Sequence, residues 1–474
     1  MSNGWMHRLR QGRGRNMTEG GIFRNLILFA LPLLAGNLFQ QLYNMVDTWV
    51  IGQTGENGAY AAVGSVGPIV NILIGFFLGL SSGAGVVISQ YFGAGNRKKV
   101  QDTVHTAMTL TLILCVVFTV LGLLMTPLFL NLMLHAEGEG GDIYPFARQY
   151  LTIYFSGVSG LMLYNMGSGI LRAIGDSRRP FYFLLASAAT NTALDLLFVF
   201  VCGMGVEGVA YATVIAQALS AILTVATLLR SDSWVRLDVR KLRIRAELLH
   251  QIVRIGIPAA LQMAITAFSN VFVQSYIAGV NADRTYCLGG WTTYSKVDQF
   301  IFMPIQSLAL SVTTFVGQNL GVGNVRRARH GTYTAYGMAT AATILLAIPV
   351  MLFAPSIAAL FNADPHVVEY AALLLRTLTP FYLCSCVNQV FSASLRGAGN
   401  SRAPMVIMLL SFVAFRQVYL WTVSRYISNE ILPIAMSYPA GWLCCCILTL
   451  LYYHRVGLSN WMGAPAEAGE PQGE

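Results

Sequence analysis

The sequence predicts an all-α polytopic membrane protein, with twelve transmembrane helices in two six-helix pseudo-symmetric lobes. Of its 474 residues, 55% are hydrophobic and only 11% are charged, which is less than half of the charged fraction of a soluble globular protein. Stretches without any charged residue, such as 57–96 and 103–136, are each long enough to cross ~30 Å of hydrocarbon at ~1.5 Å per residue. Several motifs of the first half also recur in the second half.

Breaks at glycine, proline and clusters of charge separate the predicted spans. The twelve spans are residues 22–51, 60–92, 103–125, 146–170, 181–202, 206–229, 250–279, 285–320, 331–353, 367–395, 403–426 and 431–454. The segment before the first span is rich in arginine and is interpreted as a disordered basic tail, with Met17 as a candidate natural start. The first span continues into polar residues without an A-x-A site, so we expect no cleavable signal peptide.

Most of the 30 Lys and Arg residues lie in segments on one side of the predicted membrane. Arg97, Lys98 and Lys99 follow the second span, and Arg326 and Arg327 follow the eighth. By the positive-inside rule, both termini of this multi-pass protein are predicted to be cytoplasmic, in the inner (cytoplasmic) membrane of the cell. The net charge of +9 therefore reflects topology and indicates no nucleic-acid partner.

Two motifs that follow spans of the first half recur after the corresponding spans of the second. QYFGAGNRKK (90–99) is matched by QNLGVGNVRR (318–327), and LRAIGDSRRP (171–180) is matched by LRGAGNSRAP (395–404). Because each half has six spans, both halves enter the membrane from the same side, which predicts a pseudo-twofold axis along the membrane normal. We expect a binding cleft between two such halves.

The predicted divisions are a cytoplasmic N-terminal tail (1–21), a first lobe (22–230), a cytoplasmic linker (231–249), a second lobe (250–455) and a disordered C-terminal tail (456–474). The linker mixes Trp234 and Leu237 with basic residues, which predicts contact with the inner membrane surface. The eight cysteines lie mostly in apolar segments without metal-binding spacing, so they are interpreted as small apolar residues.

A polar stripe runs along the first span, in LFQQLYNMVDTWVIGQ (38–53). Asp47, Asn44, Gln40 and Asn37 are separated by three or four residues, so they share one face of a helix. A carboxylate within a membrane span is costly and normally faces a bundle interior or a water-filled path. This favours a functional role for Asp47, while the amides have the alternative of bonding neighbouring helices.

At this point the chain resembles the multidrug and toxic compound extrusion (MATE) transporters, from about residue 17 to 455. The motifs that carry the resemblance are QQLYNMVDTWVIG (40–52), the two repeated pairs quoted above, and SKVDQFIFMP (295–304). The resemblance implies a secondary antiporter that exports cationic or amphiphilic drugs and toxic compounds in exchange for Na⁺ or H⁺. It also implies alternating access of a cleft between two lobes.

The resemblance further implies a cation site in the first lobe at Asp47, Asn191, Asp195 and Thr213. Asn191 and Asp195 are four residues apart and therefore share a helix face. Counted from the ends of their spans, Asp47, Asp195 and Thr213 all lie ~6–11 Å below the outer surface at ~1.5 Å per residue, so they can meet. Their oxygens suit Na⁺, and two neighbouring carboxylates also suit H⁺ exchange. For Asn191 and Thr213, bonding between helices remains the alternative.

The second lobe does not repeat this chemistry. The seventh span keeps a stripe of Gln262, Thr266, Asn270 and Gln274, but Val273 stands at the position that corresponds to Asp47. We therefore expect no equivalent cation site there. The amides of both stripes are expected to line the substrate cleft, and these are Asn37, Gln40, Asn44, Gln262, Asn270 and Gln274.

Lys296 and Asp298 lie inside the eighth span, and Arg416 lies inside the eleventh. Lys296 and Asp298 are two residues apart and point different ways on a helix. Asp298 is a candidate partner for Arg416. Such a pair has either a structural role or a role in coupling, and the sequence leaves both open.

Two rival functions are considered. A lipid-linked oligosaccharide flippase of the same superfamily would be expected to carry more cationic residues for a pyrophosphate. A polytopic membrane enzyme would need buried histidines for acid–base or metal chemistry, and this sequence lacks them. We therefore expect that the protein is not an enzyme. No cofactor is expected beyond the coupling ion, and no metal beyond Na⁺. The expected partners are the lipid bilayer and small cationic or amphiphilic substrates. We expect the protein to be a monomer.

Overall fold

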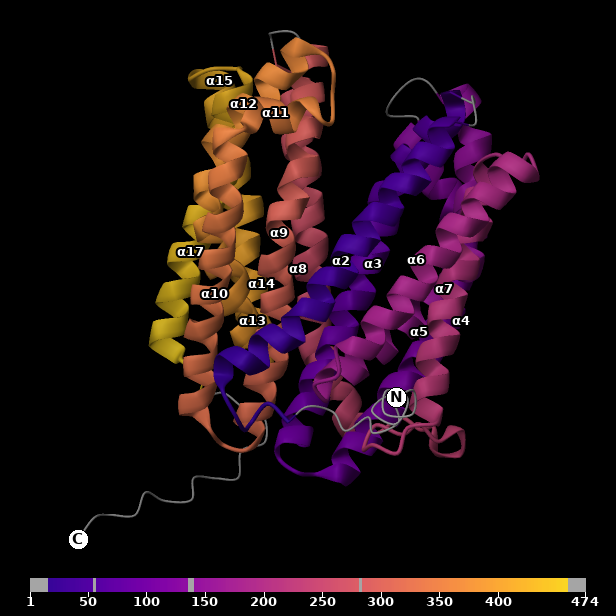
Figure 1. The fold of residues 1–474 in the computed structure, drawn as a ribbon, viewed down its shortest axis with the longest axis vertical. Helices are drawn as coiled ribbons and strands as arrows, with labels where there is room; N and C mark the ends of the chain where they lie inside the picture. Colours follow the sequence, from indigo (N-terminus) through magenta and orange to yellow (C-terminus); the bar gives the residue numbers. More distant parts are fainter. Residues whose placement is uncertain (1–15, 54–56, 135–139, 281–283, 459–474) are drawn as a thin grey trace, which may run out of the picture. The chain divides into compact units, whose positions relative to one another are not determined.

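The computed structural model describes residues 16–53, 57–134, 140–280 and 284–458, and all regular structure in these ranges is helical (Figure 1). The first nine long helices are α2 (Ile22–Gln53), α3 (Asn57–Gly93), α4 (Arg97–Leu134), α5 (Gly140–Ala173), α6 (Arg178–Leu196), α7 (Val206–Leu229), α8 (Ala246–Ala278), α9 (Arg284–Gly321) and α10 (Val325–Leu352). The later spans are interrupted, and their pieces are α12 (Pro365–Leu378), α13 (Tyr382–Gly397), α14 (Arg402–Met408), α15 (Arg416–Tyr426), α16 (Ile431–Ala435) and α17 (Ser437–Val456), with the short α11 (Ala354–Ala359) before them.

Eleven helical stretches of the described residues are long and apolar enough to cross a membrane. The predicted span that is not among them is 146–170, which forms most of α5. Its tyrosine, serine, glycine and asparagine residues lower its hydropathy. These small and polar residues suit the position of the helix, because α5 packs against both α4 and α7. At Gly160 an added Cβ would lie 3.0 Å from the backbone nitrogen of Ala218 on α7, so small residues are needed where the two helices touch.

The chain forms two compact units. The first contains Leu31–Ile88 and Asn96–Ala260, and the second contains Asn16–Ala30, Ser89–Gly95 and Leu261–Glu474. The division therefore falls inside α2, α3 and α8, and also in the turn between α3 and α4. Each unit has its own core: Leu151, Tyr154 and Val158 belong to the core of the first, and Leu375 and Tyr382 to that of the second.

The repeated sequence motifs form helix ends. Gly95 and Gly323 have φ of +72° and +76°, and Gly175 and Gly399 have +85° and +86°. These left-handed conformations close a helix and favour glycine. The four glycines stand at corresponding places of the paired motifs, which explains why each motif recurs.

The first pair of motifs also meets face to face within the second unit. An added Cβ at Gly93 would lie 2.0 Å from the carbonyl oxygen of Gln318, and one at Gly321 would lie 2.2 Å from that of Gln90. The Gln90 side chain reaches farther and donates to the Gly397 carbonyl at 2.9 Å. Glycine is therefore required at both positions for the backbones to come so close.

The linker packs on the first unit. Asp102 of α4 forms ion pairs with Arg243 (3.3 Å) and Arg245 (3.0 Å). His105 accepts the backbone N–H of Asp238 at its Nε2 (3.1 Å), while its Nδ1 lies 2.6 Å from the Gln101 carbonyl. The linker's Val235 and Leu237 are buried. This differs from the predicted contact with the membrane surface, because the apolar side chains find a protein surface instead.

The end of the predicted N-terminal tail is also docked. Met17 is fully buried, its N–H donates to Gln318 Oε1 at 2.9 Å, and its carbonyl accepts from Asn319 Nδ2 at 3.3 Å. Arg327 donates to the Gly20 carbonyl at 2.6 Å. The amides of the repeated motif thus hold residues that composition alone assigned to a disordered tail. Residues 1–15 and 459–474 of the two predicted tails lie outside the described residues.

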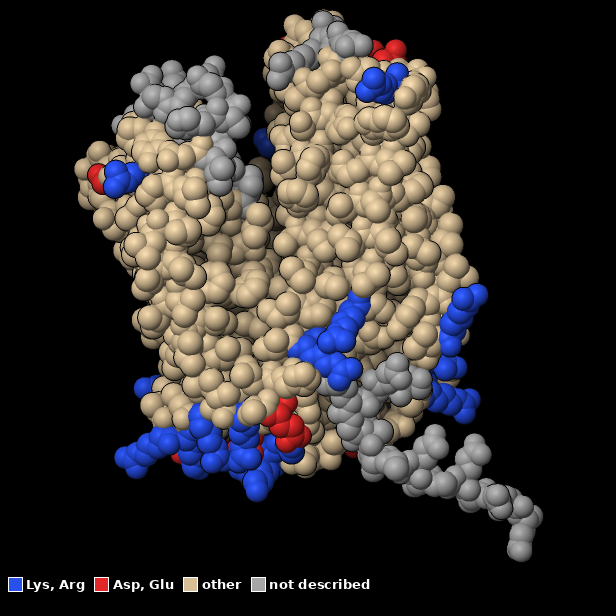
Figure 2. Space-filling view, turned by 180° about the vertical axis from the view of Figure 1, so that it is seen from behind, with Lys and Arg blue, Asp and Glu red and all other residues tan. Residues whose placement is uncertain are grey.

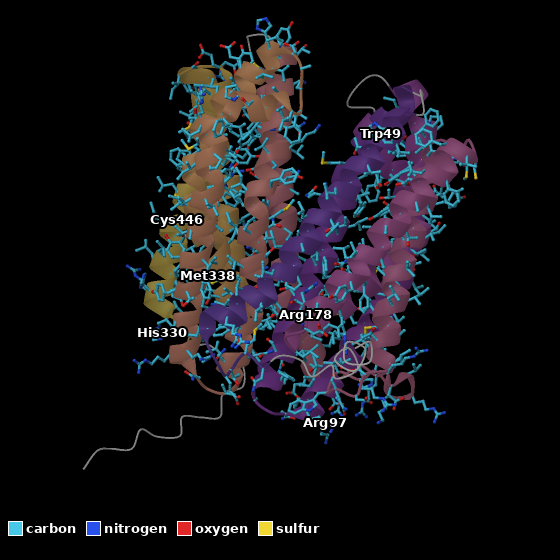
Figure 3. The ribbon with its side chains drawn as sticks, in the orientation of Figure 1. Trp49, Arg97, Arg178, His330, Met338 and Cys446 are labelled. Atoms are coloured by element: carbon cyan, nitrogen blue, oxygen red, sulfur yellow. The ribbon has the colours of Figure 1, made fainter. Side chains whose placement is uncertain are left out.

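Charged side chains avoid the middle of the helices. On the face shown in Figure 2, the upper and middle parts are almost entirely uncharged, while Lys and Arg gather toward the lower end. In the first unit, Arg97 at the start of α4 lies at that lower end, and Trp49 of α2 lies near the opposite end (Figure 3). This distribution is the one expected for helices that cross a bilayer.

Candidate functional site

The first unit holds two acids that lie together. Asp47 of α2 and Asp195 of α6 are close enough for their carboxyl groups to share a hydrogen bond. Asp195 has no exposed surface. Without a proton between the two acids, Asp47 Oδ1 and both Asp195 oxygens have no donor in the described part of the chain. Burying carboxylates without donors is expensive, so the pair is not built for stability.

Aromatic contacts on both sides of the acids hold α2 against α6. The rings of Phe39 and Phe181 are 6.2 Å apart, and those of Trp49 and Phe200 are 6.1 Å apart. Gly36, three residues before Phe39, allows close approach, because a Cβ there would lie 3.3 Å from Leu184. These contacts fix the two helices on both sides of Asp47, and so they place it opposite Asp195.

Directly after Asp195 the helix changes its winding. Leu197–Val201 forms a π-helical turn, and the Cys202 N–H donates to the Leu197 carbonyl at 3.0 Å. Such turns contain one extra residue and often lie at functional sites. Here the turn carries Phe200, which contacts Trp49. Nothing in the sequence pattern signalled this turn.

Tyrosines surround the acids. Tyr43 lies one helical turn before Asp47 and is within electrostatic range of both acids. Tyr150 is also within range of both, and its ring stacks on that of Tyr154, with 6.2 Å between the centroids. The sequence analysis missed these three side chains. Their four-residue spacing from each other or from Asp47 is the signal that could have found them.

The other two residues of the predicted cation site are placed differently. Asn191 is 2% exposed, lies one turn before Asp195, and has no hydrogen-bond partner for either side-chain atom. Thr213 lies on α7, one turn before Gln217. Among the described residues, no hydrogen bond joins Thr213 to either acid. The structure thus brings Asp47 and Asp195 together with Asn191 beside them, and Thr213 stays a prediction.

The amides predicted to line a substrate cleft vary in exposure. Asn37 and Gln40 are half-buried, and Asn44 is exposed. In the second unit, Asn270 and Gln274 are exposed. Gln262 is instead buried and donates to the sulfur of Met408 at 2.9 Å, which is a packing position.

In the second unit, the hypothesis that Asp298 pairs with Arg416 is not supported. Asp298 accepts a hydrogen bond from the Tyr382 hydroxyl. Arg416, which is 1% exposed, donates to Ser269 at 3.1 Å and is packed between the rings of Phe412 and Tyr438. The described residues contain no ion pair between the two charges, because tyrosine side chains stand between them. Lys296 is exposed and takes no part.

The first-unit site can bind a single small cation. Two carboxylates and an amide provide oxygen ligands of the kind that Na⁺ prefers. A proton is the other fitting occupant, because two adjacent carboxylates that share one proton avoid the repulsion of two charges. Either ion would satisfy oxygens that otherwise have no partner.

Comparisons with known proteins identify relatives of this chain. The family model MatE matches residues 32–197 and 258–421. The chain is 30% identical over 451 residues to the probable multidrug resistance protein YoeA of Bacillus subtilis (strain 168), covering 93% of this chain and 95% of that protein. It is 26% identical over 400 residues to the FAD transporter of Shewanella oneidensis, covering 83% and 86%.

Solved structures share the fold. A multidrug resistance MATE family transporter in an outward-facing conformation superimposes with a TM-score of 0.87 at 23% identity, covering 94% of this chain and 97% of that one. A MOP superfamily transporter from Pyrococcus furiosus Vc1 gives 0.86 at the same identity and coverage. Since the family model covers more than half of the chain and a relative at 30% identity aligns almost end to end, the chain belongs to the MatE family of membrane transporters.

Proposed function

We propose that this protein is a secondary antiporter that exports cationic or amphiphilic compounds in exchange for Na⁺ or H⁺, by alternating access. The observation that carries the proposal is the pair of Asp47 and Asp195, in which Asp47 Oδ1 and both oxygens of the fully buried Asp195 lack donors in the described residues. An ion that binds there removes an unpaired charge from the interior of the unit. Its release restores that charge, so occupancy of the site can bias a conformational equilibrium.

The substrate class rests on family membership and on relatives named as multidrug resistance proteins. The relative named as an FAD transporter shows that substrates vary among such proteins. For this chain, a cationic substrate fits a first unit whose polar site is acidic. Transport would then be an exchange, in which the coupling cation leaves as the cationic substrate binds, or the reverse.

The test is transport by the purified protein in proteoliposomes. A fluorescent cationic dye is offered under a Na⁺ gradient alone and under a H⁺ gradient alone. We expect concentrative dye movement with one of the two gradients, and none after Asp47→Asn. The matched control is Glu207→Gln, which removes one negative charge at the exposed start of α7. Undiminished driven transport by a folded Asp47→Asn variant would reject the proposed site.

FAD serves as the second probe in the same vesicles. Transport of FAD without transport of the dye would reject the cationic substrate class. Dependence of that transport on Asp47 would still support the ion site, so the two parts of the proposal can fail separately.

A further inference from the structure

The second unit contains a buried acid that the proposed function does not use. Asp298 lies on α9, one helical turn after Tyr294, and its carboxylate accepts a hydrogen bond from the Tyr382 hydroxyl of α13. The hydroxyls of Tyr382 and Tyr294 are 3.0 Å apart and bond to each other. Tyr294 and Tyr382 are 2% and 0% exposed, whereas Asp298 itself is half-buried. Asp298 therefore stands at the edge of the core.

The groups around Asp298 are hydroxyls and rings rather than cations. Tyr294 lies on its own helix, Tyr382 on α13, and Tyr438 of α17 is within electrostatic range. Arg416 of α15 lies beyond the tyrosines and is held by ring faces and by Ser269. Within the described ranges, no Lys, Arg or His forms an ion pair with Asp298. An ion pair would keep the carboxylate charged, and within those ranges Asp298 forms no ion pair.

We propose that Asp298 is a second proton-binding site, which takes up and releases one proton during the transport cycle. This goes beyond the proposed function and rests on it only for the existence of such a cycle. In the step, a proton from water adds to a carboxylate oxygen and gives the neutral acid. No other bond forms or breaks.

The tyrosine hydroxyls suit both states of this acid. A hydroxyl can donate to a carboxylate, and it can also accept from a protonated carboxyl group. The Tyr382–Tyr294 bond has no fixed direction, so the pair can reverse without moving its heavy atoms. A lysine or arginine in place of Tyr382 could only donate. The network therefore stays hydrogen-bonded through a protonation change.

The same surroundings argue for a proton rather than Na⁺. Hard cations are bound by several oxygens, often from more than one carboxylate or carbonyl. Here a single carboxyl group meets the hydroxyls of Tyr382 and Tyr294, and the rings of Phe302 and Trp442 lie 5.4 and 5.3 Å from the Tyr382 ring. Among the described residues, these side-chain oxygens are too few to replace the water shell of a metal ion.

The test is infrared difference spectroscopy of the full-length protein in lipid vesicles after a change in pH. The C=O band of a protonated carboxylic acid reports one acid without any transport. We expect a pH-dependent band in the wild type that persists in the Asp47→Asn, Asp195→Asn double variant and is lost in Asp298→Asn. Lys296→Gln, on the same helix but exposed, should keep it.

Two further variants keep the test decisive if Asp298→Asn fails to fold. Asp298→Glu should retain a pH-dependent band at a different frequency. Tyr382→Phe should move the band to higher frequency, because the carbonyl loses a hydrogen-bond donor. A band that is unchanged by substitutions of Asp298, or a band that responds to Na⁺ at constant pH, would overturn the assignment.

Transport stoichiometry gives an independent readout. If Asp298 carries a proton, the Asp298→Asn variant should move one proton fewer per exported dye molecule, measured from the pH gradient at which net dye flux vanishes. A folded, active variant with unchanged stoichiometry would refute the second site. That outcome would not affect the proposed first-unit site. Loss of driven transport in Asp47→Asn, together with a retained Asp298 band, would support both the first-unit site and the second site.

Discussion

At the scale of residues, the burial of the Asp195 carboxylate is not compensated by hydrogen bonds from the described residues. Asp195 has no exposed surface, and neither of its oxygens has a donor in the described part of the chain. Its neighbour Asn191 is equally unsatisfied. Buried polar groups in proteins are nearly always hydrogen-bonded, so this cluster supports the proposed ion site.

We therefore expect Asp47→Asn and Asp195→Asn each to abolish gradient-driven export, and the double variant to be no worse than either. Residues that form one site lose function together, so their effects do not add. Thermal unfolding should show no loss of stability in Asp195→Asn, because the change removes a buried charge. The measurement is dye export in vesicles together with a melting curve. Additive losses in the double variant would mean two separate sites.

A second residue-scale prediction concerns Asp298 and Arg416. If they were a buried ion pair, breaking it would cost ~3–5 kcal/mol, and removing both partners would restore stability. Because tyrosines separate them, we expect Arg416→Met to give no rescue of Asp298→Asn. A double-mutant cycle on thermal stability measures this, with Lys296→Gln as the control for Asp298. Clear rescue would show that the two charges interact directly.

Sequence reasoning succeeded at the level of residue type and face. Helical spacing on α2 singled out Asp47, and the motif on α6 singled out Asp195. It missed Tyr150 and Tyr154, because tyrosines at helical spacing in an apolar span resemble ordinary packing residues. It also paired Asp298 with Arg416 by opposite charge alone, since the hydroxyl that Asp298 accepts from belongs to Tyr382, on a helix far away in the sequence.

At the scale of elements, the crossing of the two repeated motifs explains their glycines. Gly93 and Gly321 each face a carbonyl of the other motif at a distance that excludes a methyl group. The sequence repeat was visible, yet its cause was not, because spacing along the chain does not show that two copies of a motif touch.

We predict that Gly93→Ala or Gly321→Ala destabilises the protein by at least ~1–3 kcal/mol, since overpacking forces the backbones apart. Gly337→Ala on α10 is the matched control, because a Cβ there meets no atom within 4 Å. That change should be neutral, or stabilising by up to ~1 kcal/mol through helix propensity. Thermal unfolding in detergent compares the three. Equal stability of all three variants would argue against the close crossing.

The linker offers another element-scale prediction. Asp102→Ala removes both ion pairs to Arg243 and Arg245. Exposed ion pairs contribute only ~0–1 kcal/mol each, so global stability should hardly change. Local opening should rise, and hydrogen exchange of the linker amides should become faster. Asp232→Ala, an exposed position in the same linker, should leave exchange unchanged. Slow exchange in Asp102→Ala would show that apolar burial alone holds the linker.

At the scale of the whole molecule, charge distribution along the sequence predicts orientation in the membrane. We expect cysteines placed at Arg97 and Arg327 to be protected from an impermeant thiol reagent in intact cells. The native Cys202, which is exposed after the fifth predicted span, should react. The reverse pattern of labelling would invert the topology.

Composition, uncharged stretches and the repeat predicted the helical class and the order of the spans, but not all of their ends, since α4 begins six residues before the predicted span 103–125 and ends nine residues after it. The predicted span 206–229 coincides with α7. What they could not show is where a span is interrupted. The tenth and eleventh predicted spans are broken into α12 and α13, and into α14 and α15, because such breaks depend on packing between helices rather than on hydropathy.

The π-helical turn after Asp195 has a geometric consequence for α6. It stores one surplus residue, and expelling that residue would rewind the segment as an ordinary helix. Because the turn ends this helix and Phe200 lies within it, the rewinding would turn Phe200 relative to Trp49 by up to ~100° about the helix axis. Asp195 lies before the turn, so its place on α6 would not depend on that change.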